Sequence, residues 1–238
     1  MRGINRMFFW LLTSVSIMVC VGAANAEGSN FKWKDTSWQV GTRYLHVELQ
    51  DKTRGEPFNG SFVGTITEIT EDQDNAPDKA YVQYRLMRTP FWIGVSYDHV
   101  SARTMDDSDG DGIADRGGGD GFVDMEGLIP YIQAAWDNKT RVTPFAQIGF
   151  AFYNADFKAD SNWSDGGRRR MNLDDTTGVE FSGGLNLRLY KNISADVFAR
   201  YMKVDDIGGD FILNGEKQSD IVFTMSYVAY GAGISCRF

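Results

Sequence analysis

From Trp38 to the last residue, apolar and polar side chains alternate with a period of two in eight separate segments. In TGVEFSGGLNLRLY, for example, Val179, Phe181 and Leu185 share one face, and polar residues such as Glu180 lie between them. This period predicts β-strands with one apolar face. We place the strands near residues 38–49, 79–88, 91–103, 126–137, 142–158, 177–190, 193–205 and 221–238.

The connections between these segments alternate between short turns and long polar loops. The short turns are Thr89-Pro90, Asn138 to Arg141, and Lys191-Asn192. The long joins cover about 51–78, 104–125, 159–176 and 206–220. Such alternation is typical of transmembrane barrels, whose turns face the periplasm and whose loops face outside. The pattern therefore predicts an all-β fold, a single eight-stranded antiparallel transmembrane β-barrel.

A barrel of this size has a lumen that side chains just fill. By strand parity, seven charged side chains point inward: Arg85, Asp98, Glu180, Arg188, Asp196, Arg200 and Arg237. Mixed signs in a narrow space predict a network of paired charges that closes the lumen rather than an open aqueous pore. Both faces of the first strand are partly apolar, so the sequence leaves open which of its side chains point into the lumen.

Aromatic residues near the predicted strand ends fit the interfacial girdles of a membrane barrel. We expect Trp136, Phe145, Tyr190 and Phe238 at the periplasmic interface and Tyr97, Tyr153 and Tyr201 at the outer one.

The amino terminus predicts export. Arg2 and Arg6 precede an apolar run over residues 7–21, and Ala24-Asn25-Ala26 follows as a small-residue cleavage site, so residues 1–26 are expected to form a signal peptide. The run is shorter than the roughly 17–25 residues of a spanning helix. Residues 27–238 then form the barrel domain, in the outer membrane of a Gram-negative bacterium.

Charge and cysteine content narrow the function classes. The full chain carries a net charge of −8; removal of two arginines leaves 22 basic against 32 acidic residues, a net −10. An acidic exported chain argues against nucleic-acid partners. Cys236 alone remains after cleavage, so no intramolecular disulfide is expected.

The stretches TPFAQIGFAFYNADF, GLNLRLYKNISADVFARYMKVDD and YGAGISCRF resemble the small eight-stranded outer-membrane barrels related to outer-membrane protein W and the opacity-type surface proteins. The resemblance covers about residues 142–238 and rests on the residue pattern along the strands and on the positions of the turns. It implies small pores for apolar compounds, adhesion, or structural roles. The expected partners are outer-membrane lipid, lipopolysaccharide and, through the C-terminal strand, the barrel-assembly machinery.

The stretch DDSDGDGIADRGGGDGFVD, which lies in the long join over 104–125, is rich in aspartate and glycine. Its spacing matches the first half of a calcium loop, but the twelfth position is Gly118, where a bidentate Glu is needed. The candidate calcium ligands are Asp107, Asp109, Asp111, Asp115, Asp120 and Asp124. The alternative is a solvated acidic loop held open by self-repulsion.

One His-x-Ser pair bears on enzymatic function. His99 and Ser101 share the lipid-facing side of a strand near the outer rim, and Glu126 opens the neighbouring strand. The pair resembles the arrangement in outer-membrane lipid A deacylases, although Ala102 follows the serine where asparagine is expected. Plain rim residues are the alternative, and we expect no enzyme.

Arg168, Arg169 and Arg170 form a short basic run that either meets anionic lipopolysaccharide or neutralises nearby acids. The sequence thus predicts a non-enzymatic barrel with a structural or surface-interaction role, whose second loop binds calcium in one interpretation. The alternative function is a small pore for small or apolar compounds.

Overall fold

The computed structural model describes residues 38–49, 66–71, 78–86, 89–106, 121–136 and 140–238. The expected signal peptide and residues 107–120 of the aspartate-rich stretch lie outside these ranges.

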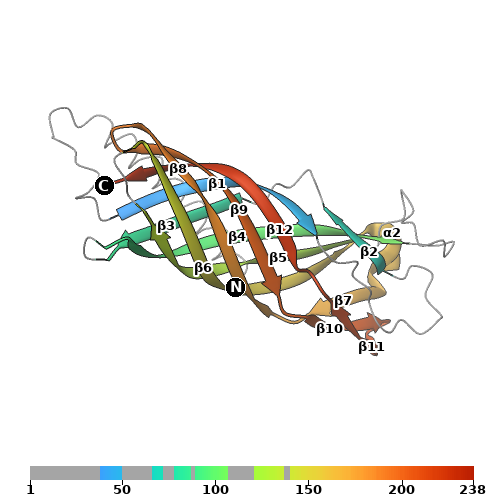
Figure 1. Ribbon diagram of the computed structural model, residues 1–238. Coiled ribbons are helices and arrows are strands. Elements are labelled where there is room, and N and C mark those ends of the chain that lie inside the picture. Colours follow the sequence, from blue (N-terminus) through green and yellow to red (C-terminus); the bar gives the residue numbers. More distant parts are fainter. Residues whose placement is uncertain (1–37, 50–65, 72–77, 87–88, 107–120, 137–139) are drawn as a thin grey trace.

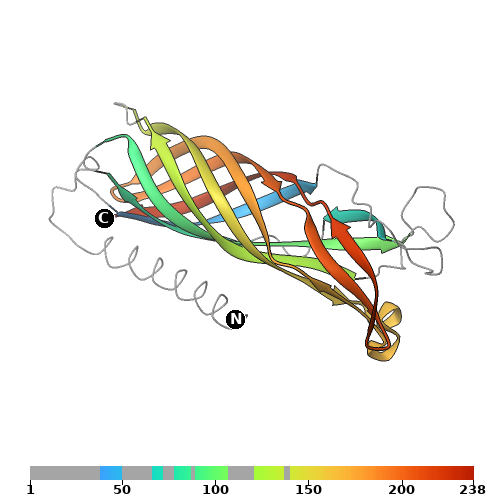
Figure 2. The same cartoon turned by 90° about the horizontal axis from the view of Figure 1, so that it is seen from below.

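Eight antiparallel strands close into a barrel (Figures 1 and 2). They are β1 (Trp38–Leu49), β3 (Asp78–Arg85), β4 (Phe91–Asp106), β5 (Gly121–Ala135), β6 (Val142–Ala159), β8 (Thr176–Tyr190), β9 (Ile193–Val204) and β12 (Tyr227–Arg237). Each pairs with the next along the chain, and β12 pairs with β1, where Val40 stands opposite Cys236. The ring leaves no free edge, which a sheet in hydrocarbon requires. The predicted fold class is confirmed.

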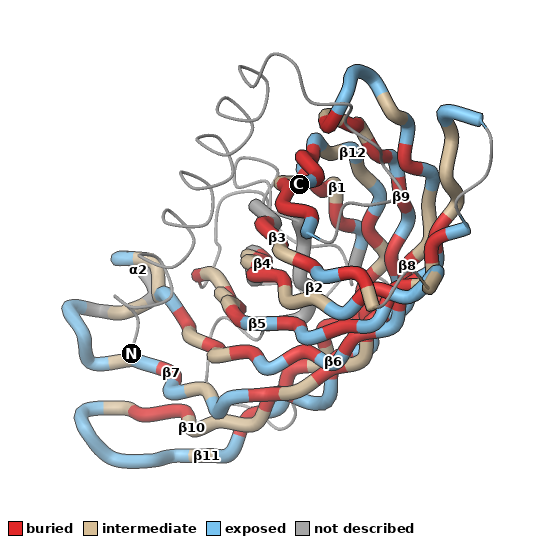
Figure 3. The backbone as a smooth tube through the Cα atoms, turned by 90° about the vertical axis from the view of Figure 1, so that its left-hand side faces the viewer, coloured by how far each residue is buried: buried red, intermediate tan, exposed pale blue. Residues whose placement is uncertain are grey.

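The two faces of the strands differ as the sequence pattern predicted. In β6, Ile148, Phe150 and Phe152 are 51%, 44% and 54% exposed, while Gln147 and the alternating inward positions are buried. Figure 3 shows this alternation of buried and exposed positions along the barrel strands. The exposed set forms an apolar belt that only a lipid environment would shield from water.

Both ends of the barrel chain lie at the same end of the molecule. Trp38 and Phe238 exchange two backbone hydrogen bonds of 2.9 Å, beside the start of β1 (Figure 1). The connection from β3 to β4 and the turn at Lys191-Asn192 lie at this end as well. In transmembrane barrels the short turns face the periplasm, so we assign this end to the periplasmic side.

The opposite, outer end contains more sheet than predicted. The strands β4 and β5 reach Asp106 and Gly121, so the join expected over 104–125 is shorter at both ends. The strand β2 (Ile66–Glu71) pairs with the end of β4. Two further elements precede β7: the helical turn α2 (Ser161–Ser164) and the 3-10 turn η2 (Asp165–Gly167). Within the described ranges, no helix is long and apolar enough to cross a bilayer.

The joins expected as loops over 159–176 and 206–220 form a second sheet, so that prediction was wrong. β7 (Arg169–Leu173), β10 (Ile207–Leu213) and β11 (Glu216–Phe223) make three strands with β10 in the middle. Asn214 and Gly215 have φ of 52° and 88°, the conformation of a tight hairpin turn. The last barrel strand therefore starts at Tyr227 and not at residue 221.

Candidate functional site in the lumen and its wall

The periplasmic half of the lumen is closed around Arg43. Its Nε donates a hydrogen bond of 2.6 Å to Asp196 Oδ2, and both side chains are buried. Its guanidinium lies 4.7 Å from the ring centre of Tyr81, 5.2 Å from that of Phe145 and 4.6 Å from that of Phe198. Aromatic faces and a carboxylate together replace the water that the guanidinium loses on burial.

Below Arg43, toward the periplasm, Gln39 connects several strands. Its Nε2 donates to Tyr81 Oη at 3.1 Å and to Ser235 Oγ at 2.9 Å. Its Oε1 accepts from Gln83 Nε2 at 3.1 Å and from Arg237 Nε at 2.9 Å. A side chain that uses donors and acceptors in four directions holds β1, β3 and β12 in register and fills the lumen at this level.

A second charged layer lies above Arg43. Arg200 Nη1 donates to Asp98 Oδ2 at 3.0 Å, and the hydroxyls of Tyr153 and Tyr227 donate to the same oxygen at 2.8 and 3.1 Å. Arg200 Nη2 also donates to Tyr227 Oη at 3.0 Å. All four side chains are at most 2% exposed. We call Asp98, Tyr153, Arg200 and Tyr227 the Asp98 layer.

These contacts test the sequence predictions for the lumen. Of the seven predicted inward charges, six are buried and Arg188 is half-buried at the periplasmic rim. The predicted network of paired charges is confirmed by the Arg43–Asp196 and Arg200–Asp98 pairs. Sequence reasoning missed Arg43 because both faces of its strand carry apolar residues. Arg43 lies on the same face of β1 as Gln39 and Gly41, and this alternation could have identified it as an inward residue.

The girdle prediction is wrong for three of the seven aromatic residues, Phe145, Tyr153 and Tyr97. Phe145 is 5% exposed beneath Arg43, and Tyr153 is 2% exposed in the Asp98 layer. Both lie on the inward parity of β6, so their rings fill the lumen rather than the membrane interface. Tyr97 is also buried, at 4% exposed, and donates a hydrogen bond to Glu126. Trp136 and Tyr190, at 54% and 58% exposed, do face outward.

Above the Asp98 layer the inward surface becomes apolar. The buried side chains that face inward from the outer parts of the barrel strands are aliphatic, sulfur-containing or aromatic: Val47, Val100, Ala102, Val123, Met125, Ala155, Phe157, Met202 and Val204. We call this set the outer lumen. It continues into Ile207 and Met225, which connect the barrel to the three-stranded sheet.

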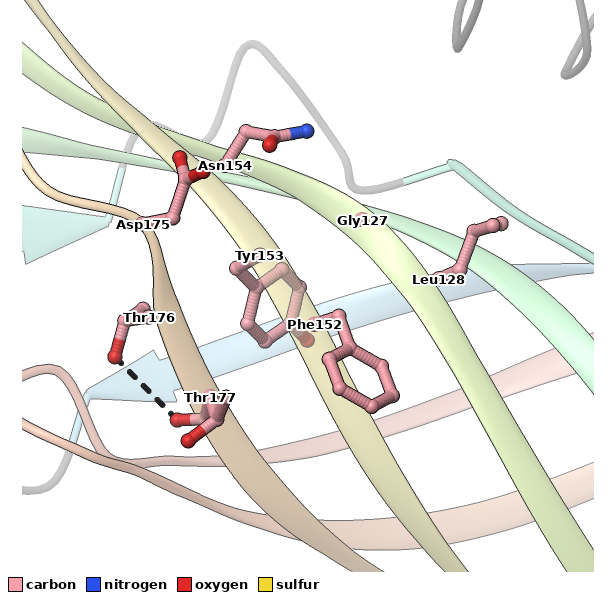
Figure 4. A pocket seen from close by; sticks show the side chains of 8 residues that line it. All are labelled: Gly127, Leu128, Phe152, Tyr153, Asn154, Asp175, Thr176 and Thr177. Atoms are coloured by element: carbon pink, nitrogen blue, oxygen red, sulfur yellow. Dashed lines mark hydrogen bonds between the residues drawn. The ribbon is translucent and has the colours of Figure 1, made fainter.

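A pocket of about 340 Å³ opens in the barrel wall at the level of the Asp98 layer. It is lined by Gly127, Leu128, Phe152, Tyr153, Asn154, Asp175, Thr176 and Thr177, from β5, β6, the start of β8 and the residue directly before it (Figure 4). Leu128 and Phe152 face outward, whereas Tyr153 belongs to the Asp98 layer. The pocket therefore lies on the lipid-facing wall at the height of the boundary between the two halves of the lumen. We call it the wall pocket.

The ladder between β5 and β6 is interrupted beside the wall pocket. Leu128 pairs with Phe152 and Tyr131 with Gly149, but the two positions between them are unpaired. One of these positions is Pro130, which has no backbone N–H to donate. The wall is consequently held by fewer hydrogen bonds at this point.

The structure describes one of the six candidate calcium ligands. Asp124 lies in β5, where its carboxylate contacts Lys158 and lies 3.2 Å from His99 Nε2. Asp107, Asp109, Asp111, Asp115 and Asp120 lie outside the described residues. Within the described part of the chain, no three His, Cys, Asp or Glu side chains gather as a metal site. The calcium loop stays a prediction.

The His-x-Ser pair lies on the outer wall, as expected. Asp124 stands opposite Ser101 in the ladder and is the hydrogen-bond partner of both His99 and Ser101. Glu126, the acid proposed from sequence, instead accepts from Tyr97 at 2.8 Å. In a nucleophilic triad the histidine bridges serine and carboxylate, whereas here the carboxylate is the shared partner. The geometry gives no support to deacylation.

Two solved structures have the same architecture. The outer membrane protein OprG from Pseudomonas aeruginosa aligns with a TM-score of 0.62 at 13% identity, over 85% of this chain and 96% of that one. The outer membrane protein AlkL in lipid bilayers aligns with a TM-score of 0.60 at 15% identity, over 90% and 95%. No family model and no curated protein sequence matches. These likenesses establish the fold and agree with the predicted resemblance to small outer-membrane barrels.

Proposed function

We propose that this small outer-membrane barrel admits small apolar molecules into its outer lumen and releases them sideways into the membrane through the wall pocket. The observation that carries the proposal is the position of the wall pocket, beside an interrupted ladder and at the level where the lumen changes from apolar to charged.

The charged half of the lumen supports a sideways rather than an axial route. An apolar molecule that continued toward the periplasm would have to separate Arg200 from Asp98 and then Arg43 from Asp196. Breaking a buried pair without replacing its partners costs about 3–5 kcal/mol. Hydrated ions meet the same obstacle, so we expect little conductance along the barrel axis.

The outer lumen supports an apolar substrate. Met125, which stands opposite Val100 in the ladder, and Met202 are fully buried, and thioether side chains adapt to ligands of varied shape. An apolar molecule that reaches these side chains meets no buried charge that it would have to displace, in contrast to the periplasmic half.

The test measures axial and lateral passage separately. In planar bilayers the wild-type protein should give almost no ionic conductance. In intact cells that express the protein, an apolar dye that fluoresces in membranes should enter faster than in cells without it. Met125→Lys, which places a charge in the outer lumen, should return dye entry to the background rate.

A matched charge outside the lumen controls for the substitution. Val222, on the outer side of β11, is 39% exposed, so Val222→Lys should leave dye entry unchanged. Heat-modifiable migration in gels establishes that each variant is folded. Strong ionic conductance, or dye entry that Met125→Lys does not slow in a folded protein, would contradict the proposal.

A surface-interaction role is a second candidate, favoured by the three-stranded sheet at the outer end. Arg170 of β7 stands opposite Ile212 in this sheet and is exposed, as is Arg168 just before the strand. Guanidinium groups bind phosphate strongly, and lipopolysaccharide carries phosphate. Replacement of both arginines by glutamine should weaken lipopolysaccharide binding by the purified protein and leave dye entry unchanged.

A further inference from the structure

We infer that the wall pocket selects amphiphiles that have a non-anionic, hydrogen-bond-donating polar end, such as an alcohol or an ammonium group, and rejects carboxylates. The inference rests on the proposed function, since it specifies the substrate of the lateral exit. It follows from the division of the pocket into an apolar and a polar side and from the charges on the polar side.

The wall pocket is apolar on one side and polar on the other. Leu128 and Phe152 are 36% and 54% exposed on the lipid-facing wall and form the apolar side. Asn154 and Asp175 lie together on the side away from Phe152 (Figure 4). Gly127 adds no side chain, and the backbone oxygen of Phe152 lies only 1.9 Å from where its Cβ would be. A short apolar chain with a polar end fits this division.

The polar side has hydrogen-bonding capacity that the protein does not use. Among the described residues, the carboxamide of Asn154 and the carboxylate of Asp175 have no hydrogen-bond or ion-pair partner. Thr176 and Thr177 are already engaged, since both donate to Asp205, through its backbone oxygen and its carboxylate respectively. A donor group on a ligand would therefore meet the carboxylate of Asp175 and the side-chain carboxamide oxygen of Asn154.

The charges around this side are mostly negative. Asp175 lines the pocket, Glu126 stands opposite Asn154 in the ladder, and Asp205 is hydrogen-bonded to Thr177. The cation Lys203 stands opposite Val179, one outward position further along β8, and none of the described residues that line the pocket is a cation. A carboxylate head would be repelled by this set, whereas a hydroxyl or an ammonium would be attracted.

The size of the pocket limits the ligand. A volume of about 340 Å³ is at the lower end of the range for small-molecule sites, too small for a whole membrane lipid. We therefore expect single-chain molecules of moderate length rather than phospholipid or lipid A.

The experiment compares three probes that share one chain: 1-octanol, octylammonium and octanoate at pH 8. The protein in lipid nanodiscs is titrated with each, and amide NMR shifts are followed at Gly127, Asn154 and Thr177. We expect saturable shifts with octanol and octylammonium, and about ten-fold weaker binding of octanoate because of one unfavourable charge contact. Shifts spread evenly over lipid-facing residues, or octanoate binding equal to that of octanol, would overturn the inference.

Asp175 and its neighbour Asp174 provide a matched pair of variants. Asp175→Asn removes the charge that lines the pocket and keeps its shape, so octanoate should then bind within about two-fold of octanol. Asp174 is also exposed but does not line the pocket, and Asp174→Asn should leave the ten-fold preference unchanged. Equal effects of the two variants would show that bulk surface charge, not the pocket, sets the preference.

The result also separates this inference from the proposed function. Specific octanol binding without any dye entry in cells would retain the pocket's selectivity and remove the transport role. Dye entry through a pocket that binds octanoate as well as octanol would retain transport and remove the selectivity.

Discussion

The two halves of the lumen are built from the same eight strands, yet their interiors have opposite chemistry. On the periplasmic side, Arg43, Asp196 and Gln39 form a closed set of ion pairs and hydrogen bonds. On the outer side, Met125, Met202 and neighbouring aliphatic residues form a buried apolar cluster. The alternation along each strand is unchanged; only the identity of the inward residues differs.

Different residues of one sheet close the lumen on the periplasmic side and offer an apolar surface on the outer side. Charged side chains close a narrow lumen well because each pair is expensive to separate once water is excluded. Apolar side chains can rearrange around an apolar ligand without separating any buried charge. The Asp98 layer is the boundary, and the wall pocket lies at this boundary.

The largest expected effect comes from breaking the boundary itself. Asp98→Asn leaves the guanidinium of Arg200 buried without its full charge partner, and the two tyrosine hydroxyls lose a carboxylate acceptor. We expect a loss of about 3–5 kcal/mol in the free energy of unfolding. Urea unfolding in detergent, followed by tryptophan fluorescence, measures the loss.

The double variant Asp98→Leu with Arg200→Met tests whether charge, rather than packing, is responsible. Replacing both members of a buried pair by apolar residues is often nearly neutral. We expect the double variant to recover most of the stability and to extend the apolar interior downward. Equal destabilisation in the single and double variants would show that the layer acts through shape alone.

A smaller effect is expected from the glycines that accommodate the lumen tyrosines. A Cβ at Gly94 would lie 2.6 Å from the ring of Tyr131, whose hydroxyl donates to Gln83 Oε1 at 3.0 Å. Gly94→Ala should therefore cost about 1–3 kcal/mol through overpacking. Gly183 is the control, because its nearest neighbour would lie at 3.4 Å. Thermal shifts in gel mobility compare the two, and a smaller loss at Gly94 than at Gly183 would contradict the packing argument.

The fold could be predicted from sequence because a membrane barrel repeats one signal eight times. Val179, Phe181 and Leu185 alternate with polar residues in a way that a lipid-facing wall imposes on every strand. The outer sheet was missed because its strands are short and its chain is polar, so composition indicated loops. The dipeptide Asn214-Gly215 between Ile212 and Ile221 was a hairpin signal that the loop interpretation overlooked.

The candidate site was harder to predict, since it depends on which side chains meet across the lumen. The alternation along each strand predicted which charged side chains point into the lumen, but it did not predict which of them pair. Asp98 pairs with Arg200, which is 102 residues away, and alternation along one strand carries no information on that distance. Tyr153 was assigned to the interface by its position near a strand end, although its parity with Gln147 pointed inward.

Pro130 is expected to affect passage more than stability. Pro130→Ala restores a backbone donor opposite Phe150 and Ala151, where the ladder between β5 and β6 is interrupted. One added hydrogen bond should stabilise the wall by about 1 kcal/mol. Dye entry should fall, while the outer lumen is unchanged. Hydrogen exchange at residues 129–131 shows whether the ladder has closed, and undiminished dye entry with a closed ladder would place the exit elsewhere.

The smallest effect should come from the outer sheet, which distinguishes the barrel from the strands attached to it. Gly215 has φ of 88° at the tip of the hairpin between β10 and β11, so Gly215→Ala strains the turn by about 1 kcal/mol. Because this sheet pairs with none of the barrel strands, the strain should stay local. We expect faster hydrogen exchange in β10 and β11 and an unchanged barrel melting temperature. A lowered barrel melting temperature would mean that the sheet is part of the barrel's cooperative unit, and the outer lumen would then depend on the hairpin for its stability.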